Sequence, residues 1–226
     1  MSGTHPDHEE HGHEGVKPST EAGRHAARIR AIEALLVEKG VLAEEDVRRQ
    51  IEYMEARSPA NGARLVARAW VDPEFKARLL SDTKAAALEL GIDASGPVVF
   101  VTVENTPEVH NLIVCTLCSC YPRAILGRPP DWYKSFNYRS RTVNEPRAVM
   151  REFGLDIPGD RRVAVHDSSA DVRYLVLPMR PPGAEGIGEE ELANLVTRDC
   201  LIGVSVPSVE GARADAPETA NPAPRR

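Results

Sequence analysis

Three of the four cysteines in this 226-residue chain lie within six positions, as Cys115, Cys118 and Cys120. Clustered thiolates are ligands for soft and borderline metal ions. The spacing leaves three familiar interpretations open. One is a zinc site that takes a fourth ligand from Cys200 or a histidine. The others are an iron–sulfur cluster and a redox disulfide between Cys115 and Cys118, which leaves Cys120 unexplained.

The segment Cys118-Ser119-Cys120 permits a fourth interpretation, in which backbone nitrogens also bind the metal. A metal held by both thiolates lies against the peptide nitrogens of Ser119 and Cys120. If these amides are deprotonated, the loop supplies three thiolates and two amidates. Such a strongly donating set favours a small trivalent cobalt or iron ion and leaves one position for water or substrate. On spacing alone, zinc is favoured over this claw.

The composition is that of a soluble globular protein, with 42% hydrophobic and 27% charged residues. The net charge of -6 gives no electrostatic reason to expect a nucleic acid or an anionic membrane as a partner. No apolar run approaches the roughly 18 residues of a membrane span. The N-terminus has no signal-peptide features, so we expect a cytoplasmic protein.

Apolar periodicity predicts an α+β fold in which a helical arm precedes a region of mixed strands and helices around the cysteines. We expect this region to be a layered α-β-β-α metal-binding domain. We expect a disordered His-rich tail at residues 1–20, the helical arm at 21–92, the catalytic domain at 93–207 and a second disordered tail at 208–226.

The predicted helices cover about residues 21–39, 44–57, 59–71, 73–80, 83–90, 145–153 and 189–198. The predicted strands cover residues 97–103, 112–115, 162–166, 172–177 and 201–206. We expect strands 162–166 and 172–177 to pair around the turn D-S-S-A-D. The Pro-rich aromatic stretch 121–138 is expected to be ordered but irregular.

The sequence around the cysteines resembles the α subunit of nitrile hydratases. The resemblance is carried by V-C-T-L-C-S-C-Y-P, L-G-R-P-P-D-W-Y-K, Y-R-S-R, E-P-R-A-V and V-T-R-D-C-L-I-G-V-S-V-P. It covers about residues 28–207, so only the two tails lie outside it.

The resemblance implies that Cys115, Cys118 and Cys120 are thiolate metal ligands and that Ser119 and Cys120 add backbone amides. It also implies that Cys118 is oxidised to sulfinic acid and Cys120 to sulfenic acid, while Cys115 stays a thiolate.

The residues beside the cysteines, Thr116 and Tyr121, are similar to those of the cobalt-type members. The resemblance therefore implies low-spin Co(III), with non-haem Fe(III) as the alternative.

The reaction implied is the hydration of a small-molecule nitrile to an amide. Cys118, Ser119 and Cys120 are the implied catalytic residues, and the oxidised Cys120 acts as nucleophile or as the base that activates water. The resemblance further implies a β subunit that completes the enzyme as a heterodimer or heterotetramer. An activator or metallochaperone is also expected, and we expect the helical arm to clasp the β subunit.

One position departs from the cobalt-type pattern. Those enzymes often have tryptophan after C-Y-P, where this chain has Arg123, so we expect a substrate pocket that favours polar or anionic substrates. The segment C-Y-P-R is similar to the metal-binding γ subunit of thiocyanate hydrolase, which converts thiocyanate to carbonyl sulfide and ammonia. Outside enzymes, a non-catalytic zinc-stabilised interaction module remains as an alternative.

A strongly negative metal loop requires hydrogen-bond donors near it. The candidate donors are Arg139, Arg141 and Arg147. We expect Cys200 to be a small buried residue rather than a fourth ligand, and His110 and His166 to be structural.

Overall fold

The computed structural model describes residues 20–209, so residues 1–19 and 210–226 of the two tails predicted to be disordered lie outside the described residues. The chain divides into two compact units at residues 52 and 53. The domain boundaries expected from the sequence stay a prediction.

The first unit contains α1 (Thr20–Glu38) and most of α2 (Glu44–Glu55). The chain turns between them at Gly40, which has a φ of 66°, a conformation that glycine adopts without steric cost. α2 has no buried residue. Ile29, Ile32 and Leu35 on α1 are 64%, 58% and 48% exposed. The apolar side chains of these helices therefore remain available to another chain.

The second unit begins with α3 (Pro59–Val71), α4 (Pro73–Ser81) and α5 (Thr83–Glu89). The side chain of Asp72 accepts a hydrogen bond from Phe75 N at 2.9 Å and begins α4. Asp82 caps α5 in the same way, by accepting from Ala85 N at 3.0 Å. The three predicted helices are confirmed. The caps of α4 and α5 come from residues next to each helix, so a sequence pattern can indicate where these two helices begin.

Among residues 20–209, four strands form two parallel pairs. β1 (Val99–Glu104) pairs with β4 (Val172–Leu177), and β2 (Val109–Val114) pairs with β3 (Arg162–Asp167). The expected pairing of β3 with β4 is therefore wrong, because the turn between them carries the chain from one pair to the other. The last three residues of β4 are almost fully buried, as is typical of parallel strands covered on both faces.

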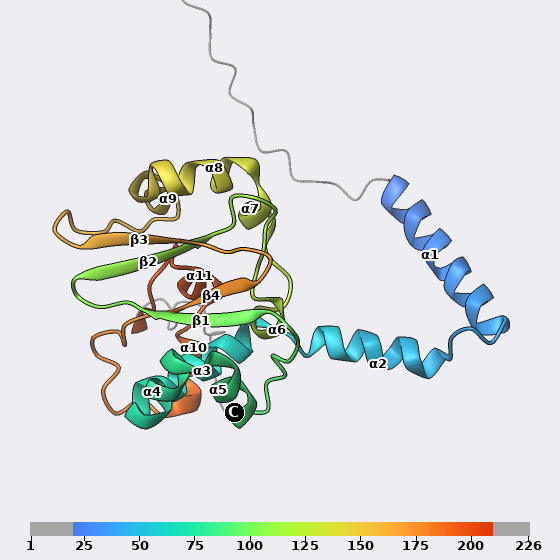
Figure 1. The fold of residues 1–226 in the computed structure, drawn as a ribbon, viewed down its shortest axis with the longest axis horizontal. Helices are drawn as coiled ribbons and strands as arrows, with labels where there is room; N and C mark the ends of the chain where they lie inside the picture. Colours follow the sequence, from blue (N-terminus) through green and yellow to red (C-terminus); the bar gives the residue numbers. More distant parts are fainter. Residues whose placement is uncertain (1–19, 210–226) are drawn as a thin grey trace, which may run out of the picture. The chain divides into compact units, whose positions relative to one another are not determined.

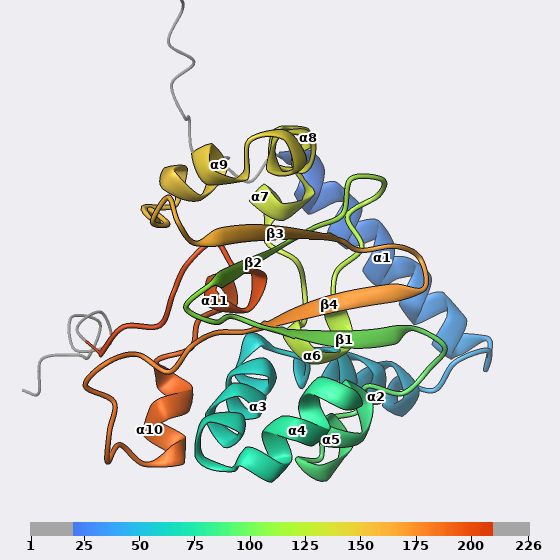
Figure 2. The same cartoon turned by 60° about the vertical axis from the view of Figure 1, so that its left-hand side comes forward.

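Two groups of helices flank the strand pairs, as Figures 1 and 2 show. α7 (Asp131–Lys134), α8 (Phe136–Asn144) and α9 (Pro146–Glu152) lie on the β2–β3 side. α3, α4 and α5 lie on the β1–β4 side. The second unit also contains α6 (Arg123–Leu126), α10 (Glu189–Asn194) and α11 (Arg198–Ile202). The α+β class is confirmed, with helices on either side of two strand layers.

The segment after α10 differs from the prediction. Residues 201–206 form no strand, and the predicted helix 189–198 ends at Asn194. A different helix, α11 (Arg198–Ile202), is capped by Thr197 at its N-terminus and by Gly203, whose φ is 91°, at its C-terminus. A short apolar run has the same pattern in a buried helix as in a buried strand, and here the caps at both ends decide for the helix.

The hydrophobic core fills the space between the strand pairs and their helices. Leu112, Ile113 and Val114 of β2 are fully buried immediately before residues 115–120, which we call the cysteine loop. Trp132 packs edge to face against Tyr138 and Phe153, with ring centroids 4.9 and 4.8 Å apart. The loop therefore starts from a rigid strand and lies beside a packed aromatic cluster. Within residues 20–209, no helix has the length and apolar character needed to cross a membrane.

Candidate metal centre

The three clustered thiols meet where β2 ends. Cys115 follows the last residue of β2 and is fully buried, whereas Cys120 is half-buried and Cys118 is exposed. The Sγ atoms of Cys115 and Cys118 are 3.7 Å apart, and those of Cys118 and Cys120 are 3.1 Å apart. All three sulfurs lie within 4.8 Å of one another, and they form the one cluster of at least three potential metal ligands among residues 20–209.

The backbone between the last two thiols is strained. Ser119 has a φ of 78° and is the one non-glycine residue with positive φ in the described part of the chain. This left-handed conformation costs a residue with a Cβ about 1–2 kcal/mol. Such strain is retained where the surrounding structure enforces it, often at functional sites. The conformation lets Cys118 and Cys120 direct their sulfurs to the same place, so the donor set fits a metal ion.

The loop is anchored to the neighbouring strand through Asp167. This residue pairs with Val114 at the end of the β2–β3 register, so its carboxylate lies beside the start of the loop. Oδ1 accepts a hydrogen bond from Thr116 N at 2.9 Å, and Oδ2 accepts one from Thr116 Oγ1 at 2.6 Å. Asp167 is a site residue that sequence reasoning missed, because its position in D-S-S-A-D suggested only a turn.

Two side chains bind the carbonyl groups of the loop. Arg139 donates to Cys115 O at 3.1 Å, to Thr116 O at 2.8 Å and to Leu117 O at 2.7 Å. Tyr133 Oη donates to Cys120 O at 2.8 Å. The donors required by the sequence argument are therefore present, but they bind the backbone of the loop.

The other two candidate arginines bind elsewhere. Arg141 pairs with Glu145 and Glu152, in each case with an N–O distance of 2.6 Å. Arg147 donates to the carbonyl groups of Ile157, Pro158 and Arg161. Of the three arginines, only Arg139 reaches the cysteine loop.

The electrostatics of the loop distinguish Cys115 from Cys120. Burial raises the pKa of the Cys115 thiol, but the backbone N–H groups of Cys118, Cys120 and Leu117 outweigh burial and lower it. Burial, the Cys118 thiol and the charge of Cys115 raise the pKa of Cys120 to about 12, although Arg173 opposes this shift. We infer that Cys115 ionises before Cys120 and that its charge then hinders the ionisation of Cys120.

The remaining cysteine and two histidines are structural. Cys200 is buried in α11 and contacts Thr197 Oγ1 at 3.2 Å, away from the thiol cluster. His110 is fully buried with Nε2 2.7 Å from Gly203 O, and burial lowers its pKa. His166 Nε2 lies 2.8 Å from Asn111 Oδ1. These contacts agree with the roles expected from the sequence.

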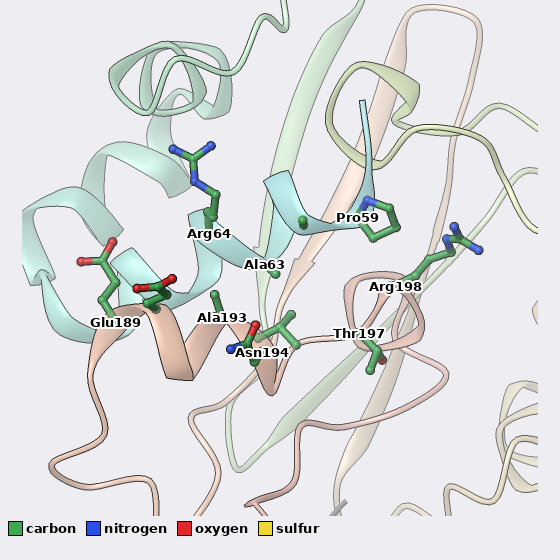
Figure 3. Close-up of a pocket in the computed structure, with 11 residues that line it drawn as sticks. Pro59, Ala63, Arg64, Glu189, Ala193, Asn194, Thr197 and Arg198 are labelled. Carbon is green, nitrogen blue, oxygen red and sulfur yellow. The ribbon is translucent and has the colours of Figure 1, made fainter. Parts of the chain in front are cut away.

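Arg123 lies at the start of α6 and is exposed. It lines a small pocket of about 110 Å³ with Met54, Arg57, Gly127 and Arg128. A pocket of about 690 Å³ lies elsewhere, between α3 and α10, with Arg64 and Glu189 among its lining residues (Figure 3). Neither pocket contains a clustered cysteine, so the place of Arg123 in a substrate pocket stays a prediction.

The fold and the loop together define a metal-binding α+β chain whose donors are thiols. Residues 23–205 match the family model of the nitrile hydratase alpha chain. The low-molecular weight cobalt-containing nitrile hydratase subunit alpha of Rhodococcus rhodochrous is 52% identical over 184 residues, which cover 81% of this chain and 89% of that relative. This chain therefore belongs to the nitrile hydratase α-chain family.

Two further relatives show the range of this family. The thiocyanate hydrolase subunit gamma of Thiobacillus thioparus is 45% identical over 188 residues, which cover 78% of this chain and 77% of that relative. The structure of a double mutant of the Fe-type nitrile hydratase from Comamonas testosteroni Ni1 aligns with a TM-score of 0.77 and 44% identity. That alignment covers 90% of this chain and all of the other.

Proposed function

We propose that this chain is the α subunit of a cobalt nitrile hydratase, which hydrates nitriles to amides together with a β subunit. The observation that carries the proposal is the convergence of Cys115, Cys118 and Cys120 within 4.8 Å in a member of this family. The similarity to a cobalt-containing relative supports cobalt, and the Fe-type structure keeps iron as the alternative.

The proposed ligands are the sulfurs of Cys115, Cys118 and Cys120 and the amide nitrogens of Ser119 and Cys120. The sulfur distances and the left-handed Ser119 support this set. A bound Co(III) ion supplies Lewis acidity for the attack of water on the nitrile carbon.

The exposure of the thiols supports the proposed pattern of oxidation. Cys118 is exposed and Cys120 is half-buried, so an oxidant can reach both sulfurs. Cys115 is fully buried, which favours its persistence as a plain thiolate. We propose that Cys118 becomes sulfinic acid, and that Cys120 becomes sulfenic acid and acts as nucleophile or as the base that activates water.

A β subunit is proposed as the partner because apolar side chains remain exposed on the chain. In the first unit, the exposed side chains include Ile29, Ile32 and Leu35. In the second unit, Leu117 in the cysteine loop and Phe136 at the start of α8 are 81% and 79% exposed. A partner that covered these side chains would remove apolar area from water and close the metal site to bulk solvent.

The test is to coexpress the full-length chain with a nitrile hydratase β subunit. We expect about one cobalt per α chain, as the single cluster provides, two added oxygens on Cys118 and one on Cys120 by mass spectrometry, and amide formed from nitrile. Cys118→Ser should abolish cobalt binding and activity, whereas the matched control Cys200→Ala should retain both. Bound zinc with unoxidised cysteines would refute the proposal and favour a zinc-stabilised module.

Arg123 favours one second candidate, the metal-binding subunit of a thiocyanate hydrolase. An exposed guanidinium close in sequence to the thiols suits an anionic substrate, and a thiocyanate hydrolase subunit is among the similar proteins. Assays of thiocyanate beside a panel of nitriles separate the two functions. Release of carbonyl sulfide and ammonia without amide formation would establish the thiocyanate hydrolase function.

A further inference from the structure

The three hydrogen bonds of Arg139 differ from an ordinary surface contact. They reach three consecutive carbonyl groups, of Cys115, Thr116 and Leu117, at 2.7–3.1 Å. A guanidinium presents several N–H groups in a rigid planar fork, so one side chain can span these acceptors.

Arg139 is held in place by its own helix. Ser135 Oγ accepts a hydrogen bond from Tyr138 N at 3.1 Å and begins α8. The Tyr138 hydroxyl donates to Ile113 O in β2 at 2.6 Å, so α8 is attached to the strand from which the cysteine loop emerges. The position of the guanidinium is therefore set by the fold, independently of any metal.

The carbonyl groups that Arg139 binds determine where the next amide groups point. In a planar trans peptide, the C=O of one residue and the N–H of the next point in opposite directions. Three carbonyls bound on one side therefore turn the N–H groups of Thr116, Leu117 and Cys118 away from the guanidinium. In agreement, Thr116 N donates to Asp167, and Cys118 N donates to Cys115 Sγ at 3.3 Å.

The charge of Arg139 is also available to the loop. Within residues 20–209, no carboxylate forms an ion pair with it, whereas Arg141 on the same helix pairs with Glu145 and Glu152. A guanidinium remains charged at any ordinary pH, so it offsets part of the negative charge that clustered thiolates introduce.

We propose that Arg139 is a positioning residue that holds the turn from Cys115 to Cys118 in its sulfur-gathering conformation and thereby sets the affinity of the loop for its metal. The inference rests on the proposed function only in requiring that the clustered thiols bind a metal. It does not depend on which substrate the enzyme hydrates.

The test titrates the metal-free, reduced, full-length chain with Co(II) under anaerobic conditions and follows the sulfur-to-cobalt charge-transfer absorption. We expect Arg139→Gln to weaken Co(II) binding by about 10- to 100-fold, the range typical of residues that support metal ligands, and to shift the absorption band. Arg139→Lys should restore part of the affinity, because it keeps the charge but loses the planar fork. The matched control Arg141→Gln should bind Co(II) as the parent does, because its partly exposed ion pairs contribute little and do not involve the cysteine loop.

Circular dichroism shows whether each variant is folded at the titration temperature. If Arg139→Gln is folded, parent-like affinity together with a parent-like band overturns the proposal. If it is not folded, Arg139→Lys decides, and parent-like binding by that variant overturns the proposal. An equal loss in Arg141→Gln also overturns it.

The nitrile assay separates this inference from the proposed function. If the parent complex hydrates no nitrile, the proposed function is refuted. If its Arg139 variants nevertheless bind cobalt more weakly than the parent, this inference still holds. A parent chain whose thiols bind no Co(II) overturns both.

Discussion

Removing the hydroxyl of Tyr133 tests how strongly the protein holds the end of the cysteine loop. Tyr133 is fully buried, and its hydroxyl donates to Cys120 O at 2.8 Å. Burial raises its pKa far above the ordinary value, so the phenol remains a donor throughout the physiological range. Tyr133→Phe keeps the ring that packs against Tyr121 and Trp132 and removes the hydroxyl that donates to Cys120 O.

The magnitude follows from leaving a carbonyl in the loop without its donor. This costs about 1–3 kcal/mol. At about 2 kcal/mol, a domain of this size should lose about 4–8 °C in Tm. If the whole cost falls on the conformation that binds metal, cobalt affinity should fall about 30-fold, since about 1.4 kcal/mol corresponds to a factor of ten.

The assay compares Tyr133→Phe with Thr83→Val. The Thr83 hydroxyl is also buried and donates to a backbone carbonyl, Leu79 O at 3.2 Å, but this hydrogen bond joins α5 to α4 rather than supporting the cysteine loop. Both variants should lose similar thermal stability, whereas only Tyr133→Phe should lose cobalt affinity to this extent. Equal affinities of the two variants for Co(II) would refute the reasoning.

Three further predictions concern pH, backbone geometry and substrate choice. Burial lowers the pKa of His110 in the folded state, so the free energy of unfolding should fall as pH drops below about 6.5, by up to about 1.4 kcal/mol per pH unit. Denaturant titrations at several pH values should show that this dependence is weaker in His110→Gln. In Gly203→Ala, the new Cβ would lie 2.0 Å from Asn111 O, so we expect the free energy of unfolding to fall by more than about 3 kcal/mol. Gly183 also has a positive φ but has open space around it, so Gly183→Ala should lower the free energy of unfolding by about 1 kcal/mol. Equal unfolding free energies of the two variants would contradict the close approach at Gly203. Arg123→Trp should raise kcat/KM for aromatic nitriles relative to anionic substrates, and an unchanged ratio would place Arg123 outside the substrate pocket.

Sequence reasoning succeeded where the determinants are local. The helices at 59–71 and 73–81 are bounded by prolines and by the Asp72 cap, so their ends follow from neighbouring residues. It failed for the pairing of β3 and β4, because parallel pairing joins segments that are far apart in the chain. It also failed at α11, where an apolar run fits either a helix or a strand.

The sequence by itself determined which atoms can bind a metal. The spacing of Cys115, Cys118 and Cys120 is covalent, so it limits the chemistry before the chain folds. The family resemblance carried by the flanking residues then reduced the choice among zinc, iron–sulfur and claw sites.

Only the tertiary structure decided what holds those atoms together. Asp167 reaches Thr116 because of the β2–β3 register, and Arg139 reaches three carbonyls because α8 is attached to β2. The left-handed Ser119 persists within a loop that is bound on both sides. Hydrogen bonds between distant segments depend on how elements pack, and packing is a property of the whole fold rather than of any short stretch of sequence.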